Sequence, residues 1–188
     1  MSKLSDNIWF TRKARIQASE RLLSNDNHSQ ILLVYFSIVN ICLAVILIKY
    51  NNLLGGNTNL ALVLMSIIIL VTSLFVTNKN FKSRAELLKN HYINLQKFYF
   101  EALDAEKNND GKKIAEIRGK YTDSLDLPEN HRSIDDYVSR VFNRGNLTSR
   151  VPTKYEISVA YGYKICRFVT LVLFYTSPFL AIYVASLL

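Results

Sequence analysis

Long uncharged runs dominate the pattern of hydrophobic and polar positions along the chain. Three of them are long enough to cross a lipid bilayer: Ile31–Ile48 with 18 residues, Thr58–Asn78 with 21 and Phe168–Leu188 with 21. At about 1.5 Å of rise per residue, such helices extend roughly 27–32 Å, which matches a hydrocarbon core of about 30 Å. The pattern therefore predicts three transmembrane helices, the first two joined as a hairpin by the Asn- and Gly-rich segment Tyr50–Asn57.

The third predicted span contains a proline near its middle, Pro178. Proline removes one helical hydrogen bond, and membrane helices tolerate it where neighbouring groups satisfy the freed carbonyl. We therefore expect the third span to be a kinked helix.

The chain before the first span predicts an amphipathic helix. Residues 6–28 carry an apolar stripe at seven-residue spacing among cationic side chains, formed by Trp9, Ile16 and Leu23. Two arrangements are consistent with this pattern. The helix either lies in the membrane interface with Trp9 and Phe10 as anchors, or packs its stripe against the other polar helices.

Residues 79–107 are expected to continue the second span as a helix, since neither Gly nor Pro interrupts them. Apolar and aromatic residues recur there at seven-residue intervals, in the set Leu88, Tyr92, Leu95, Tyr99 and Ala102. Three such repeats are a coiled-coil signal. The set is therefore a candidate oligomerisation helix, although packing within the chain explains the same pattern.

Two shorter helices are predicted before the third span. One follows Gly111 and stops before Pro128, and its apolar side is formed by Ile114, Ile117, Tyr121 and Leu125. The other begins at Ser133 as the N-cap and is terminated by Gly145. From Lys154 onward the pattern predicts one helix that leads into the third span.

The chain has no alternating strand pattern, so the predicted fold class is all-α. We expect an oligomeric membrane protein with an N-terminal amphipathic helix (1–30) and a transmembrane hairpin (31–78). A polar helical region (79–154) follows, and residues 155–188 lead into the third, C-terminal span.

The charges indicate an orientation for these segments. Of the 23 Lys and Arg residues, five precede residue 31, one lies in the hairpin at 49–57 and 17 lie in 79–167. Basic residues close to membrane spans concentrate on the cytoplasmic side. We therefore expect the N-terminus and residues 79–167 to be cytoplasmic, with the hairpin and the chain end outside.

Enzyme motifs are absent from the sequence, which has no Gly-rich phosphate loop, no G-x-S-x-G and no H-E-x-x-H. His28, His91 and His131 are far apart and lack partners at metal-ligand spacing. Asp135 and Asp136 are adjacent, so on a helix they point about 100° apart, and we interpret them as charge that complements the helix dipole. We expect no enzyme, no cofactor and no metal site.

Small polar residues recur inside the first two spans, at Ser37, Asn40, Asn59, Ser66, Ser73 and Thr77. Such residues let membrane helices approach closely and form hydrogen bonds. The seam either only holds the spans together or faces water in a central pore. Because two or three helices do not enclose a channel, a pore requires an oligomer. The spans contain no charged residue, which disfavours a proton relay, a voltage sensor or an ion-coupled transporter.

Residues 79–167 have a net charge of +5, from 17 basic and 12 acidic residues, which raises the question of nucleic-acid binding. Much of the excess lies beside the spans, where membrane orientation and anionic lipid explain it. The aromatic residues Tyr92, Phe98, Tyr99 and Phe100 have the spacing of a helix core. Direct nucleic-acid binding is therefore disfavoured.

Three stretches carry a resemblance to a known family. Residues 12–22 read RKARIQASERL, residues 31–37 read ILLVYFS and residues 80–85 read NFKSRA, and the last stretch leads into a helix with Tyr92, Leu95 and Leu103. Over about residues 8–125 the chain resembles SLATT-domain proteins, bacterial two-span membrane effectors associated with nucleotide-signalling and reverse-transcriptase conflict systems. The third span departs from the two-span pattern.

The resemblance implies an effector of anti-phage defence in the bacterial inner membrane. Once triggered, it would oligomerise into a pore or disrupt the membrane, and so arrest or kill the infected cell. The implied partners are the lipid bilayer, further copies of the chain, and a sensor or trigger protein of the same system or its nucleotide product. The alternative is a non-conducting membrane anchor or adaptor that recruits a soluble enzyme.

Overall fold

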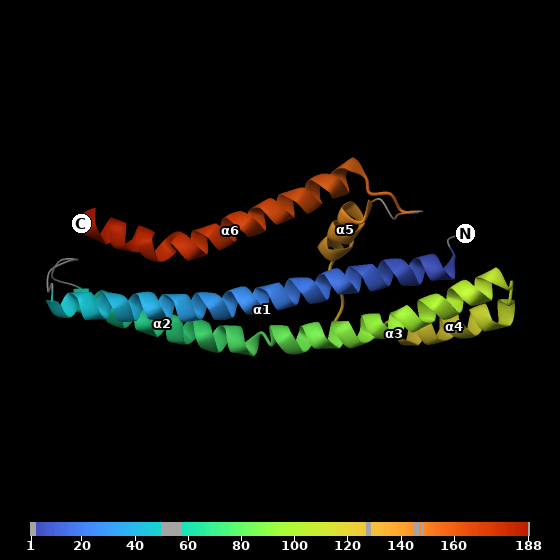
Figure 1. Cartoon of the computed structure of the whole chain (residues 1–188), viewed down its shortest axis with the longest axis horizontal. Helices are drawn as coiled ribbons and strands as arrows, with labels where there is room; N and C mark the ends of the chain where they lie inside the picture. The colour runs from blue at the N-terminus through green and yellow to red at the C-terminus, as the bar shows by residue number, and fades with distance from the viewer. Residues whose placement is uncertain (1–2, 50–57, 127–128, 145–146, 148, 188) are drawn as a thin grey trace. The chain divides into compact units, whose positions relative to one another are not determined.

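The structure, a computed structural model, describes residues 3–49, 58–126, 129–144, 147 and 149–187, with the side chains of all of these except 58, 59, 61 and 181–187. It confirms the all-α fold class, because the described residues form helices and no strand (Figure 1). Within these described residues, three stretches are long and apolar enough to cross a membrane. The helices are α1 (Leu4–Lys49), α2 (Thr58–Asn78), α3 (Phe81–Lys107), α4 (Gly111–Asp123), α5 (Ser133–Phe142) and α6 (Lys154–Leu187).

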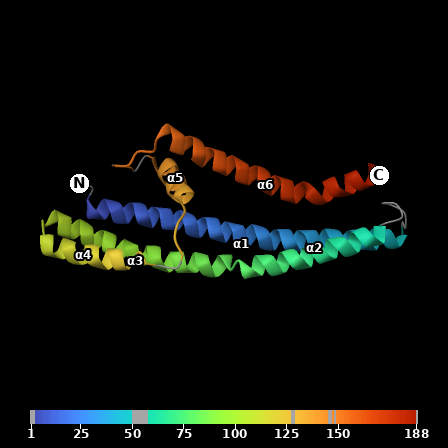
Figure 2. The ribbon, with the colours of Figure 1, turned by 180° about the vertical axis from the view of Figure 1, so that it is seen from behind.

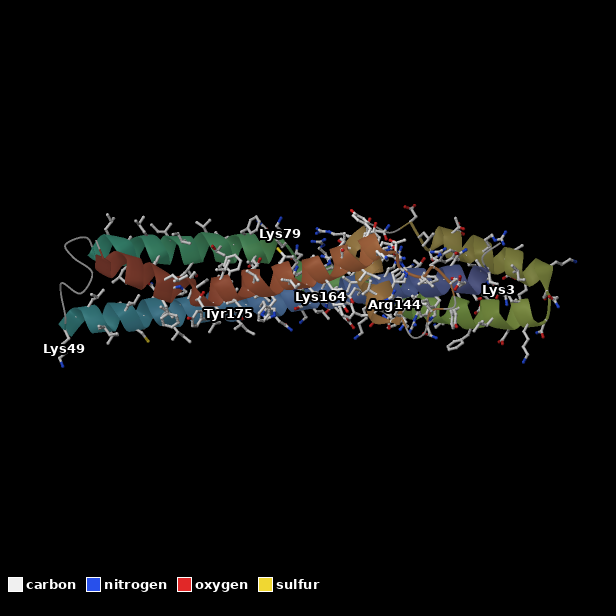
Figure 3. The ribbon with its side chains drawn as sticks, turned by 90° about the horizontal axis from the view of Figure 1, so that it is seen from above. Lys3, Lys49, Lys79, Arg144, Lys164 and Tyr175 are labelled. Atoms are coloured by element: carbon white, nitrogen blue, oxygen red, sulfur yellow. The ribbon has the colours of Figure 1, made fainter. Side chains whose placement is uncertain are left out.

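The chain divides into two compact units. We call Met1–Leu23 with Phe81–Lys164 the polar unit, and Ser24–Asn80 with Ile165–Leu188 the apolar unit. The helices α1 and α6 contribute residues to both. Figure 3 shows the difference in chemistry, since nitrogen and oxygen atoms gather on the helices of the polar unit while α2 carries mainly carbon.

In the polar unit, α3 and α4 lie side by side (Figures 1 and 2) and pack against the beginning of α1. The shared core contains Leu4, Ile8, Leu95, Ala102, Ala105 and Ile117, against which Ile114 and Tyr121 also pack. The predicted apolar side of α4 therefore faces the core as expected. A second cluster joins α1 to α3 through Ala18, Leu22, Ala85 and Leu88.

The buried face of α1 differs from the predicted stripe. Leu23 is 39% exposed, and Trp9 and Ile16 are only half-buried, whereas the buried residues are Leu4, Ile8, Ala14, Ala18 and Leu22. Phe10 is 3% exposed, so it does not act as a membrane anchor here. Small alanines on the packed face let α1 approach α3 closely, and a search for large apolar residues overlooks them. Of the two arrangements proposed for this helix, the structure has the one that packs against the polar helices.

The expected continuous helix from the second span through residue 107 is wrong in one place. Helix α2 ends at Asn78 and α3 begins at Phe81. Asn80 between them has a φ of 46°, in the left-handed region that asparagine tolerates better than most residues. Lys79 and Asn80 donate their backbone N–H groups three residues back, to Val76 and Thr77. The chain thus makes a short turn at an asparagine rather than at Gly or Pro.

The third cluster of the polar unit joins α5 to the start of α6 through Val138, Val141 and Ala160. The N-cap of α5 is Arg132 and not Ser133, because the carboxylate of Asp135 accepts the backbone N–H of Arg132 at 2.8 Å. Helix α6 is continuous from Lys154, as predicted, and contains Pro178. The predicted hairpin at 50–57, and the roles assigned to Pro128 and Gly145, lie outside the described residues.

Candidate functional site

Among the described side chains, one direct contact joins the predicted polar seam of the first span to that of the second. The Asn40 amide Nδ2 on α1 donates to Ser66 Oγ on α2 at 2.9 Å. Two other hydroxyls of the seam bond within their own helices: Ser37 donates to the Leu33 carbonyl at 2.8 Å, and Thr77 donates to the Ser73 carbonyl at 2.9 Å. A hydroxyl satisfied by its own backbone needs no partner in lipid. The side chain of Asn59 lies outside the described residues.

A second set of contacts joins α1 to α6 in the apolar unit. The Tyr35 hydroxyl donates to the Tyr175 carbonyl at 3.0 Å, and His28 Nδ1 lies 3.3 Å from the Tyr175 hydroxyl. Pro178 lacks the N–H that would bond the Phe174 carbonyl, and the Ser177 hydroxyl donates to that carbonyl at 2.9 Å. The Phe174 carbonyl, which Pro178 leaves without its helical donor, is therefore satisfied by a neighbouring hydroxyl, as expected. The hydrogen bond between Tyr35 and Tyr175 joins the same part of α6 to α1.

The apolar helices of a single chain bury few of their side chains. Within the most apolar window of each candidate span, 6%, 0% and 6% of the residues are buried, in chain order. Exposed leucine, isoleucine and phenylalanine side chains follow α2 along its described length. Such surfaces require either lipid or further protein.

The predicted oligomerisation helix is used within the chain. Leu88, Leu95 and Ala102 are each 0% exposed in the cores described above. The α3 residues that stay exposed are others, notably Ile93 at 45% and Phe100 at 55%. Phe100 is thus not the core residue that its spacing predicts. It lies in a shallow groove of about 370 Å³ whose lining also includes Arg12, Tyr92 and Lys97.

Two ion pairs, one buried and one half-buried, join segments of the polar unit that are far apart in the sequence. Arg21 on α1 binds Asp135 on α5 with both side chains almost fully buried, and Arg84 on α3 binds Glu129 at 2.6 Å. The hydrogen bonds from Arg84 lower the pKa of Glu129. Sequence reasoning assigned Asp135 only to the helix dipole, and its position at the start of a helix gave no sign of a distant arginine.

Arg140 on α5 connects that helix to α6. Its guanidinium contacts Asp136 at 2.9 Å and also binds Glu156. Hydrogen bonds from Arg140, with help from the backbone of Thr153, lower the pKa of Glu156 to about 2. Thr153 and Glu156 form a capping box at the start of α6, and the Thr-x-x-Glu pattern in the sequence is the local signal for it.

Arg15 is the most unusual buried group. It is only 1% exposed. Among the described residues its guanidinium contacts the Nδ1 atom of His91 and does not contact any carboxylate. Burial, and then the charge of Arg15, lower the pKa of His91 to about 4, so the ring is neutral at pH 7 and can accept the hydrogen bond. Arg15 Nε and His91 Nε2 are buried without hydrogen-bond partners.

The described part of the chain contains no cluster of metal-ligating side chains and no disulfide. No group of three His, Cys, Asp or Glu side chains there lies close enough to hold a metal ion. Cys42 and Cys166 are both free and exposed.

Comparison with known proteins gives one match. The model of the family described as "SMODS and SLOG-associating 2TM effector domain family 5", SLATT_5, matches residues 1–185. No curated protein and no solved structure matches the chain. The family match extends well beyond the stretches that carry the resemblance in the sequence and includes the third apolar helix.

Proposed function

The chain belongs to SMODS and SLOG-associating 2TM effector domain family 5, and from that premise we propose that it is a triggered pore-forming effector. Membership makes it a membrane effector associated with defence systems. The proposal adds that copies of the chain assemble into a pore in the bacterial inner membrane and thereby arrest or kill a phage-infected cell.

The observation that supports the pore most directly is the bare surface of α2. No residue in its most apolar stretch is buried, and among the described side chains its one hydrogen bond to α1 runs from Asn40 to Ser66. Among the described polar side chains near the middle of this helix, Ser66 and Thr72 are exposed and Ser73 is half-buried. Assembly of several chains would cover the apolar faces and bring the polar positions together.

The same proposal places the polar unit in the cytoplasm. The charges that favour this orientation include Lys79 and Arg84 at the end of α2 and start of α3, and Lys164 and Arg167 on α6. The polar unit offers the polar surface that a trigger needs, so we propose that the sensor or trigger protein, or its nucleotide product, acts there. The inner membrane is then the site of action.

The test is single-channel current from full-length protein in planar bilayers. Ser73→Leu removes a polar seam side chain whose hydroxyl forms no interhelical bond in the described structure, and it should abolish or strongly reduce stepwise conductance. Leu74→Ile, next to it on the same helix, is the matched control and should conduct like wild type. Conductance that Ser73→Leu leaves unchanged would move the pore lining away from this face.

A non-conducting adaptor is the second candidate, and the groove on α3 is the observation in its favour. Ile93 and Phe100 present exposed apolar surface beside the cations Arg12 and Lys97, as a docking surface for a soluble enzyme would. Under this alternative, Phe100→Ala abolishes the triggered cellular response while Ser73→Leu does not. The pore proposal expects the opposite ranking, so the two variants separate the two functions.

A further inference from the structure

Aromatic and cationic side chains gather where α5 packs against the first turns of α6 (Figures 1 and 2). We call Phe142, Tyr161 and Lys164 the aromatic patch, and all three belong to the polar unit. The ring centroids of Phe142 and Tyr161 are 5.5 Å apart, and Lys164 Nζ lies 5.4 Å from the centre of the Phe142 ring. The buried cluster that includes Val141 and Ala160 holds the two helices together, so the patch is a fixed feature of the fold.

Both rings of the aromatic patch are open on their outer side. Phe142 is 54% exposed and Tyr161 is 51% exposed, although each touches the other. Exposed phenylalanine is unfavourable in water. At the surface of a bilayer the same combination is favourable, because tyrosine is enriched at the headgroup level and lysine extends its charge from an apolar stem into the polar layer.

The position of the patch along α6 places it beside the membrane. Helix α6 is continuous, and its uncharged run begins at Phe168, seven residues after Tyr161 and four after Lys164. At 1.5 Å of rise per residue these separations are about 10 and 6 Å. The headgroup layer extends roughly 5–8 Å beyond the hydrocarbon on each side. If α6 crosses the bilayer from Phe168 onward, Lys164 lies in the headgroup layer and Tyr161 at its outer edge, and Phe142, which contacts both, lies at the same depth.

The chain around the patch carries an excess of positive charge. Residues 139–188 contain six basic residues and one acidic residue, Glu156, which Arg140 binds. None of the described ion pairs involves Lys164 or Arg144, both exposed and both labelled in Figure 3. These two cations are therefore available to anionic lipid headgroups, which attract basic residues close to the membrane surface.

We propose that the aromatic patch docks on anionic phospholipid at the membrane surface. The rings of Phe142 and Tyr161 insert among the headgroups, and the ammonium of Lys164 binds a lipid phosphate. The interfacial role that the sequence suggested for Phe10 on α1, which is buried, belongs instead to the end of α5 and the start of α6. Docking by this patch does not depend on the formation of a pore.

The test is tryptophan fluorescence of the full-length protein in liposomes of phosphatidylcholine and phosphatidylglycerol in equal amounts, brominated on the acyl chains near the headgroup. Trp9 is the single tryptophan of the chain, so Trp9→Phe gives a dark background. Added to it, Phe142→Trp should be quenched by the brominated lipid. The matched control is Phe100→Trp, because Phe100 is 55% exposed but lies far along α3 from the end of α2, and it should not be quenched. Phe174→Trp, inside the apolar run of α6, should be quenched and verifies that this run lies in the bilayer.

The charge of the patch is tested by placing the bromine on one lipid at a time. Brominated phosphatidylglycerol should quench Phe142→Trp more strongly than brominated phosphatidylcholine. Lys164→Gln should lower this preference about fivefold, since it removes one cation from the anionic surface, and Lys164→Arg should retain it. Lys107→Gln, the same change at an exposed lysine at the end of α3, is the matched control and should leave the preference unchanged.

Quenching of Phe142→Trp no stronger than that of Phe100→Trp would overturn the docking. A blue-shifted emission from Phe142→Trp without quenching would also overturn it, because a second copy of the chain then covers the patch in place of lipid. Equal quenching by the two brominated lipids would overturn the assignment to anionic headgroups. Since the measurement needs no current, an absent pore leaves the result intact.

Discussion

Arg21 on α1 and Asp135 on α5, 114 residues apart in the chain, form a two-pronged ion pair inside the polar unit. Arg21 Nε lies 2.7 Å from Asp135 Oδ1, and Arg21 Nη2 lies 3.0 Å from Oδ2. The two side chains are 5% and 2% exposed. Oδ2 also accepts the backbone N–H of Arg132, so one carboxylate both caps α5 and ties it to α1.

Asp135→Asn should destabilise the polar unit strongly. It leaves the buried guanidinium of Arg21 without a counter-charge, and breaking a buried pair in this way costs about 3–5 kcal/mol. Chemical denaturation of the solubilised protein, followed by circular dichroism, measures the change in the free energy of unfolding. Glu116→Gln breaks the exposed pair with Lys120 and is the control, with little effect expected. A loss for Asp135→Asn no larger than for the control would contradict the structural role of the pair.

Acidification should destabilise the polar unit through His91. The pKa of His91 is about 4 in the folded protein and 6.5 in the unfolded chain. Between these two pH values, His91 is protonated in the unfolded chain but neutral in the folded protein, and this difference favours unfolding. The stabilisation is complete above pH 6.5 and is lost as the pH falls toward 4. Thermal unfolding at a series of pH values measures this slope.

His91→Asn provides the comparison for the acid effect, because its amide retains an acceptor for Arg15 but does not titrate. We expect its melting temperature to change less between pH 7 and pH 5 than that of wild type. His131 has a lowered pKa as well, chiefly from burial, so some dependence should remain in the variant. Identical slopes for variant and wild type would show that His91 does not sense the pH.

Ser66→Ala should weaken the contact between α1 and α2. It removes the acceptor of the Asn40 amide, whose Oδ1 is already buried without a partner, and such interhelical bonds contribute about 1 kcal/mol in membranes. Unfolding by dodecyl sulfate in mixed micelles measures the loss. Ser37→Ala removes a hydroxyl that bonds only its own helix and should change the stability less. The reverse ranking would argue against the Asn40–Ser66 contact.

Ser177→Ala should be destabilising only while Pro178 is present. With the proline in place, the Ser177 hydroxyl is the donor for the Phe174 carbonyl, and its removal leaves that carbonyl unsatisfied at a cost of about 1 kcal/mol. In a Pro178→Ala background the helical N–H returns and bonds the same carbonyl. We therefore expect a double-mutant cycle in mixed micelles to show that Ser177→Ala lowers the free energy of unfolding clearly in wild type and hardly at all in the Pro178→Ala background. Equal effects would exclude this role for Ser177.

The positions of most helices in this protein follow from two local patterns in the sequence, the uncharged runs and the spacing of apolar residues. The uncharged runs became α2 and parts of α1 and α6, and the apolar side of α4, with Ile114, Ile117 and Tyr121, packs as expected. These features depend on neighbours within a few turns of one helix, so periodicity reports them. The turn at Asn80 is a local feature that periodicity missed, because asparagine at a left-handed position has no effect on the apolar spacing.

What only the tertiary structure decided is which face of each helix is buried and which charges are paired. Small residues such as Ala18 lie in the core while Phe100 stays exposed, because close packing between particular helices selects by shape as well as by hydrophobicity. Asp135 meets Arg21 across 114 residues, and Arg15 meets His91 across 76. Burial of a charge depends on what surrounds it in three dimensions, and no local pattern of residues encodes those surroundings.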